Sequence, residues 1–172
     1  KAYNVASLYS DTTSAIYHYA NYQLAIIDGV KDMTNSKLER LKKLVRCGGE
    51  YTDNAWYEMG RTYISLGEEG MTSTGIEVLK EFVKSNEKSE FYVDALMSLG
   101  LGYYNIRQFD NALETYKKVI ACNPKTQIAL EALRSISEIY IDERGAVDEY
   151  WEYANQSGVE ADLSTATLDS LT

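Results

Sequence analysis

The chain has 172 residues, 45% of them apolar, and a net charge of −9 because 26 acidic side chains outnumber 17 basic ones. This much apolar surface predicts a folded protein with a sizeable core, normally a single domain. The negative charge repels a phosphate backbone and argues against nucleic acid as a partner. No apolar run reaches the roughly 18 residues that a helix needs to span a bilayer, which argues against direct insertion into a membrane.

One helical pattern recurs along the chain. Large apolar residues at Ile16, Trp56 and Leu96 are 40 residues apart, and Leu133 follows 37 residues later. Each is followed three residues later by a second large residue and then by a small one, as the period of an amphipathic helix requires. A unit of this length cannot bury its own apolar face and must stack on its neighbours, so the repetition predicts an α-solenoid.

The first unit is less regular than those that follow. Tyr19 and Ala20 continue the stripe begun by Ile16, and a second helix is expected around residues 37–46. That second helix lacks a small residue where it would cross the first. Terminal repeats commonly depart from the pattern of internal ones, so the irregularity agrees with a place at the edge of the array.

The two central units read as helix, turn and helix. In the second unit, glycines predict a mobile loop over residues 67–74, before a helix in which Gly75 is the small crossing residue. In the third unit, Asp110 is suited to be the N-cap of the second helix, and Pro124 ends that helix.

In the last unit the first helix runs through Tyr140. The register after Gly145 stays open, because Ala146, Glu149 or Tyr150 can each occupy the crossing position of the second helix. The two cysteines belong to different units, whose separation exceeds the reach of a disulfide, so we predict two free thiols.

The third unit resembles the tetratricopeptide repeat (TPR) family. The matching residues are Leu96, Leu99, Gly100, Tyr103, Phe109, Ala112, Tyr116 and Pro124. The resemblance implies an all-α protein, an α-solenoid of antiparallel helix pairs wound into a right-handed superhelix. Extended to the other units, it implies a solenoid over residues 1–157, with repeats at approximately 13–48, 53–88, 93–126 and 130–157, and a polar tail over 158–172.

The resemblance also implies where a partner binds. In TPR proteins the first helices line the concave face, and residues one, five and eight places after the large apolar position point into it. In this chain those residues are Tyr17, Asn21, Leu24, Tyr57, Arg61, Ile64, Met97, Leu101, Tyr104, Arg134, Glu138 and Ile141. This aromatic, aliphatic and arginine-containing set suits a protein or peptide partner, although packing on neighbouring helices explains it equally well.

Catalysis, metal binding and cofactor binding have little support in the sequence. His18 is the one histidine and lies among tyrosines in a helical segment, which favours a structural role. The acidic pairs at residues 68–69 and 148–149 fit solvated loop and helix-start positions, and two distant cysteines cannot form a tetrahedral zinc site. We therefore expect a non-catalytic interaction scaffold without a cofactor.

Charge is distributed unevenly. The stretch 37–46 is basic, whereas residues 131–152 are acidic, and this asymmetry leaves open weak head-to-tail self-association, with the chain as a structural or self-assembly spacer.

A narrower resemblance concerns units longer than about 34 residues and the stretch 89–95, which are similar to those of bacterial cell-envelope TPR proteins. These include the group that works with outer-membrane assembly and the Tol system. The resemblance implies a periplasmic or envelope location, with the cytoplasm as the alternative. Because the chain begins at Lys1 without an initiator Met or a signal-peptide core, we expect a processed chain or part of a larger envelope protein.

Overall fold

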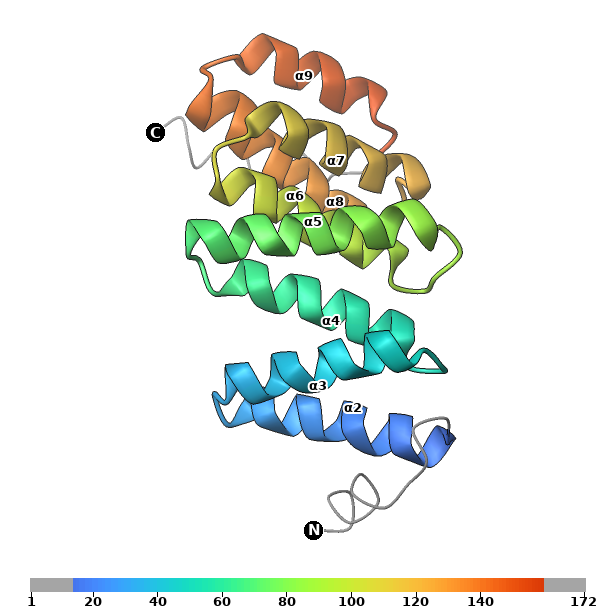
Figure 1. Cartoon of the computed structure of the whole chain (residues 1–172). Coiled ribbons are helices and arrows are strands. Elements are labelled where there is room, and N and C mark those ends of the chain that lie inside the picture. Colours follow the sequence, from blue (N-terminus) through green and yellow to red (C-terminus); the bar gives the residue numbers. More distant parts are fainter. Residues whose placement is uncertain (1–13, 160–172) are drawn as a thin grey trace. The chain divides into compact units, whose positions relative to one another are not determined.

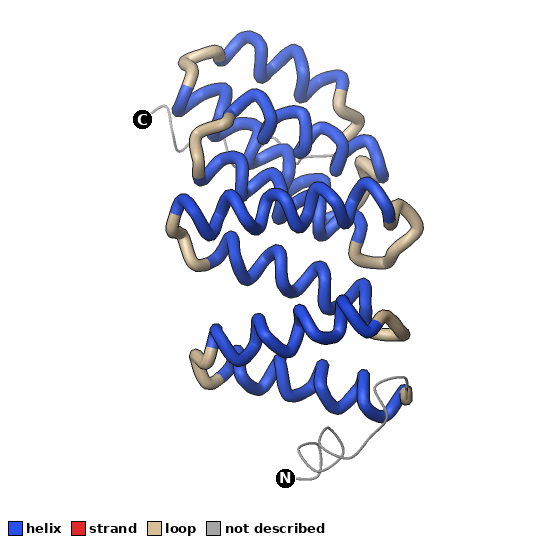
Figure 2. The backbone as a smooth tube through the Cα atoms, in the orientation of Figure 1, coloured by secondary structure: helices blue, strands red, loops and turns tan. Residues whose placement is uncertain are grey.

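The structure is a computed structural model that describes residues 14–159, and all regular secondary structure in this range is helical (Figures 1 and 2). This confirms the all-α prediction. The first 13 residues of the predicted solenoid and most of the predicted tail at 158–172 lie outside the described residues.

The chain divides into two compact units, the first ending at Gln108 and the second beginning at Phe109. In the first unit each helix packs against the next one in the chain, and α4 also contacts α6. Packing between sequence neighbours is the arrangement of stacked helix pairs. The helices are α2 (Ala15–Val30), α3 (Thr34–Cys47), α4 (Thr52–Ser65), α5 (Glu69–Ser85) and α6 (Tyr92–Asn105).

The second unit is built in the same way. Here α7 packs against α8, and α9 contacts both α8 and the π-helical turn η1 that extends α8. Its elements are α7 (Phe109–Cys122), α8 (Gln127–Ser137), η1 (Glu138–Glu143) and α9 (Val147–Gln156).

Local sequence signals explain several helix ends. The Ser14 hydroxyl accepts a hydrogen bond of 3.2 Å from the Tyr17 backbone N–H and caps α2, and Thr126 caps α8 in the same way. At its C-terminus α3 stops at Gly48, whose φ of 69° suits glycine. As predicted, α7 ends before Pro124.

Leucines and small residues form the core of the first unit. Leu41 and Leu44 of α3 are almost completely buried and pack with Ala55 of α4, whereas Leu79 and Phe82 of α5 belong to the next cluster along the chain. Burial of each such side chain favours folding by about 1.5–3 kcal/mol, so these layers hold the helices in place.

The orientation of α2 differs from the prediction. Ile16 and Tyr19, expected to face the core, are 65% and 41% exposed, whereas Tyr17 and Asn21 are only 2% and 4% exposed. The prediction is wrong for Ile16 and Tyr19 but correct for Ala20, which is 1% exposed. The difference arises because α2 turns its Tyr17 side toward α3, where the Lys43 ammonium lies 5.3 Å from the centroid of the Tyr17 ring.

The predicted loop over residues 67–74 is also wrong, since α5 begins at Glu69 and the connector comprises only residues 66–68. Gly70 falls in the first turn of α5, where the Thr74 hydroxyl donates a 2.9 Å hydrogen bond to its carbonyl oxygen. A helix that is packed along its length tolerates a glycine, at a cost of about 1 kcal/mol relative to alanine.

Two smaller points concern helix starts. Asp110 lies in the first turn of α7 and is not its N-cap, because the helix begins one residue earlier at Phe109. In α9 the open choice is settled in favour of Tyr150, which is 8% exposed, whereas Ala146 precedes the helix and Glu149 is exposed.

Candidate partner-binding surface

The residues predicted to face a partner have very different exposures. Tyr17, Asn21 and Ile64 are buried at 2%, 4% and 2% exposure, so their side chains serve packing. Two further groups lie nearer the surface. The half-buried residues are Leu24, Tyr57, Met97 and Tyr104, and the exposed residues are Arg61, Leu101, Arg134, Glu138 and Ile141.

Five residues of this set lie on α4 and α6, two helices that contact one another. We call this the α4–α6 surface, and its members are Tyr57, Arg61, Met97, Leu101 and Tyr104. It includes a large exposed aliphatic side chain, that of Leu101, which is 47% exposed. The predicted residues of α8 and η1 belong to the other unit and are considered separately.

Tyr57 is positioned by aromatic stacking. Its ring lies almost parallel to that of Phe91, with an interplanar angle of 17° and 5.3 Å between the ring centroids. The Arg61 guanidinium carbon lies 5.8 Å from the centroid of the Tyr57 ring. A hydrogen bond with Tyr57 raises the pKa of Arg61 above its ordinary value. The result is a fixed aromatic ring next to a half-exposed cation.

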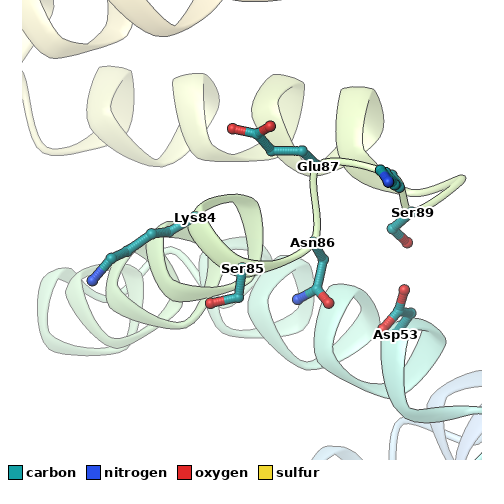
Figure 3. Close-up of a pocket in the computed structure, with 7 residues that line it drawn as sticks. Asp53, Lys84, Ser85, Asn86, Glu87 and Ser89 are labelled. Carbon is teal, nitrogen blue, oxygen red and sulfur yellow. The ribbon is translucent and has the colours of Figure 1, made fainter.

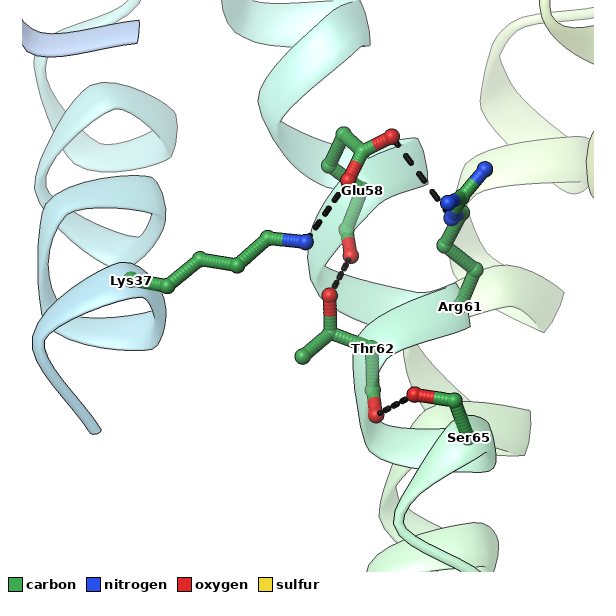
Figure 4. Close-up of polar contacts among 5 residues, drawn as sticks. All are labelled: Lys37, Glu58, Arg61, Thr62 and Ser65. Carbon is green, nitrogen blue, oxygen red and sulfur yellow. Dashed lines mark hydrogen bonds and ion pairs between the residues drawn. The ribbon is translucent and has the colours of Figure 1, made fainter. Parts of the chain in front are cut away.

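Behind this surface a carboxylate joins two cations from different helices (Figure 4). One oxygen of Glu58 accepts a 2.9 Å hydrogen bond from Lys37 of α3, and the other lies 3.6 Å from Arg61 Nε. The Lys37 and Glu58 side chains are both 12% exposed, so their ion pair is largely removed from water. Glu58 therefore restrains the position of Arg61 and ties α4 to α3.

Sequence reasoning missed the aromatic residues that precede the first helices. Tyr51 stacks on Tyr22 of α2 with 5.2 Å between ring centroids, as Phe91 stacks on Tyr57. Tyr51 and Phe91 are 40 residues apart, so the repeat spacing was the signal that could have identified them. Burial raises the pKa of Tyr22, and nearby Glu58 acts in the same direction.

The predicted residues of the second unit lie on α8 and η1. Arg134 and Glu138 are exposed, and Ile141 is 38% exposed. The π turn of η1 changes the spacing of side chains relative to an α-helix, which leaves Ile139 fully buried and Tyr140 at 8% exposure. Ile141 thus follows two core residues and is an apolar side chain at the surface.

A polar pocket of about 470 Å³ lies at the connection between α5 and α6 (Figure 3). Two of the side chains that Figure 3 draws serve the local backbone, since Asn86 donates to the Phe82 carbonyl at 3.1 Å and Ser89 accepts from the Phe91 N–H at 3.4 Å. None of the predicted binding residues lines this pocket, whose lining residues are Asp53, Lys84, Ser85, Asn86, Glu87, Lys88 and Ser89.

Within residues 14–159 there is no group of three or more potential metal ligands, and no helix has the length and apolar character needed to cross a membrane. Cys47 and Cys122 are free thiols at the surface, as predicted. His18 is 4% exposed and packs against the backbone of Gly49, which is a structural environment.

Comparisons with known proteins agree with the repeat fold. Residues 94–126 match the sequence profile of the tetratricopeptide repeat. The chain is similar in structure to the nearly identical TPR-like repeats of a Podosopora anserina protein described as a kinesin light chain, with a TM-score of 0.69 and 14% identity over 90% of this chain and 81% of that one.

A second structure of those repeats, carrying one substitution, gives a TM-score of 0.71 and 15% identity over 90% of this chain and 79% of that one. No curated protein sequence matches the chain. At this level of identity the similarity establishes the fold, an all-α solenoid of TPR-like repeats.

Proposed function

We propose that the protein is a non-catalytic scaffold that binds a peptide or protein segment on the concave face formed by the first helices of its repeats. The profile match over residues 94–126 and the similarity in fold to TPR-like repeats support this proposal, because TPR repeats in general mediate interactions between proteins. On this proposal the repeats comprise residues 13–48, 53–88, 93–126 and 130–157.

The observation that carries the proposal is the pairing of a fixed aromatic ring with an exposed cation on the α4–α6 surface. Arg61 is held by Glu58 at 3.6 Å and lies over Tyr57, which is itself stacked on Phe91. Side chains that are already ordered lose little conformational entropy when a partner binds. Arginine and tyrosine are also enriched among the residues that dominate binding energy.

A selection experiment tests this proposal. Peptides are selected from a displayed random library on the full chain, and their affinities are measured for two double variants. Leu101→Ser with Arg61→Gln changes the α4–α6 surface, whereas Leu66→Ser with Lys80→Gln changes a 40% exposed leucine and an exposed lysine elsewhere. We expect about tenfold weaker binding to the first variant and unchanged binding to the second.

Equal affinities for both double variants would contradict the assignment of partner binding to the α4–α6 surface. Tyr57 is left intact in this design because its ring packs on Phe91, so Tyr57→Ala would change stability as well as binding.

A second candidate function is self-assembly, favoured by the segregation of charge. Helix α3 carries five basic residues against one acidic residue, whereas exposed carboxylates of the second unit include Glu131, Asp148 and Glu152. Association of unlike surfaces between copies is an electrostatic attraction that salt screens. Light scattering at low and high salt tests it, and a monomer at both salt concentrations would exclude this function.

We further propose a periplasmic or cell-envelope location in a bacterium, on the basis of the unit length and the stretch 89–95. Chemical cross-linking in the native envelope, followed by mass spectrometry, tests both location and partner. If the protein were cross-linked only to cytoplasmic proteins, the proposed location would be overturned.

A further inference from the structure

A groove of about 490 Å³ lies between α2 and α3, separate from the α4–α6 surface. Its lining comes from one residue of α2 and five of α3, which are Asn21, Ser36, Glu39, Arg40, Lys43 and Arg46. Three of these side chains are cationic and one is a carboxylate, in a protein whose net charge is −9. The groove is therefore a local positive site on an acidic molecule.

The one carboxylate in the groove is already paired. Glu39 Oε1 accepts a 2.9 Å hydrogen bond from Lys42, which lies outside the lining, and this bond lowers the pKa of Glu39. By contrast, Lys43 and Arg46 have no ion-pair partner among the residues that the structure describes. Glu39 acts on Arg46 only through its charge, without an ion pair, so these two cations are the least compensated in the groove.

The Arg40 side chain is held by an ion pair but keeps N–H groups that can bind a ligand. Its Nε donates a 2.8 Å hydrogen bond to Asp28, whose side chain is 10% exposed. Because a guanidinium carries five N–H groups, the two terminal amino groups remain able to donate to a ligand. The Arg40 side chain is 32% exposed, so these groups reach the groove from a fixed position.

Asn21 lines the groove from α2 with a side chain that is held in place. It is 4% exposed, and its Nδ2 donates a 2.9 Å hydrogen bond to the Tyr17 carbonyl oxygen, which fixes the amide. Lys43 lies with its ammonium 5.3 Å from the Tyr17 ring centroid. Tyr17 does not line the groove, and its buried hydroxyl has no hydrogen-bond partner among the described residues. The groove therefore combines an ordered amide with cations that are only partly compensated.

The spacing of the cations indicates the shape of the ligand. Arg40, Lys43 and Arg46 are each three residues apart, which corresponds to about 4.5 Å along the helix axis per step and about 9 Å in total. An anion whose charges are spread over a similar length can contact all three at once. In an extended polypeptide, side chains on one face are about 7 Å apart, so two carboxylates of a short acidic segment match this length.

We propose that the groove between α2 and α3 is a second binding site, and that its ligand is an extended acidic polypeptide segment. Arg40 and Lys43 would bind one carboxylate and Arg46 the next, with the Asn21 amide beside the ligand. Because the protein as a whole repels anions, binding of an acidic peptide must come from a local site such as this groove.

Fluorescence anisotropy with a fluorescein-labelled hexaglutamate peptide and the full chain tests the proposal. We expect saturable binding that Lys43→Gln with Arg46→Gln weakens about tenfold and Arg46→Gln alone weakens about threefold. The matched control is Lys84→Gln with Lys88→Gln, which changes net charge equally, and it should bind like the parent. Arg46 is exposed at the end of α3, so its replacement should leave the melting temperature unchanged.

The proposal would be overturned by no binding to the parent, by equal weakening by the control variant, or by displacement of the peptide by inorganic phosphate at matched ionic strength. The last would indicate a compact anion site. Arg61→Gln separates this site from the proposed function, because it changes the α4–α6 surface and should bind hexaglutamate like the parent. Equal loss with Arg61→Gln would place the peptide on the α4–α6 surface and contradict the proposal.

Discussion

Gly75 of α5 approaches Gly60 of α4 so closely that a Cβ atom at residue 75 would lie 2.8 Å from the Gly60 carbonyl oxygen. Both residues are buried. A Cβ at Gly60 would in turn lie 2.5 Å from Leu79 Cγ. The two helices thus cross where neither has a side chain, and their separation depends on this pair of glycines.

Gly75→Ala is expected to destabilise the protein by about 1–3 kcal/mol, because the clash involves backbone atoms that cannot move without shifting a helix. Gly70→Ala is the matched control in the same helix, since a Cβ there meets nothing within 4 Å. The control should have unchanged stability or gain less than about 1 kcal/mol. Urea unfolding followed by circular dichroism measures both, and equal stability of the two variants would refute the close crossing.

Glu58→Gln is expected to cost about 1–3 kcal/mol of stability, because it leaves the largely buried Lys37 ammonium without its carboxylate. Asp110→Asn provides the comparison. Its ion pair with Arg144 is 2.7 Å long, but the Asp110 side chain is 94% exposed, so its loss should cost less than about 1 kcal/mol. Thermal unfolding of both variants checks the order, and a larger loss for Asp110→Asn would contradict it.

Cys122 provides a prediction about the pH dependence of thiol reactivity. Although Cys122 lies at the surface, partial burial of its thiol raises the pKa, so less of the reactive thiolate is present at a given pH. The rate of its alkylation by iodoacetamide should therefore rise with pH, with a midpoint above that of the same cysteine in the unfolded chain. Peptide mapping by mass spectrometry at several pH values measures this, with the urea-unfolded protein as reference. Identical midpoints in folded and unfolded protein would disprove the effect of burial.

Lys117 joins α7 to the C-terminal elements of the second unit. Its ammonium donates a 3.0 Å hydrogen bond to the Tyr140 hydroxyl and lies 4.6 Å from the Tyr153 ring centroid. Tyr140→Phe, which removes only the hydroxyl, should cost about 0.5–1.5 kcal/mol. Tyr153→Phe keeps the ring under the ammonium and should cost less. Chemical unfolding monitored by tryptophan fluorescence measures the stability of both variants. A larger loss of stability for Tyr153→Phe than for Tyr140→Phe would show that the hydrogen bond from Lys117 contributes little.

The fold class follows from the sequence because its signals are local and repeated. Apolar residues at helical spacing that recur every 40 residues predict repeated helix pairs, whichever helices pack against one another. Pro124 likewise ends a helix in any environment. The free thiols and the crossing glycine at residue 75 are predicted on the same basis.

The candidate surface depends on interactions that a single helix does not contain. The rotation that buries Tyr17 and Asn21 while exposing Ile16 results from packing of α2 on α3. Likewise, Tyr57 is fixed by Phe91, a residue 34 positions away in the chain. Whether a side chain at a given helical position packs or faces solvent depends on which helix lies opposite, and periodicity in one helix carries no information about that neighbour.

The sequence by itself therefore determined that the chain forms stacked helix pairs, since apolar period, spacing and helix breakers act within each segment. Only the tertiary structure decided where α5 begins, how the π turn η1 orders Ile139 and Tyr140, and which cations are least compensated in the groove between α2 and α3. These features depend on distances between residues of different elements, and burial and charge compensation exist only once those elements have packed.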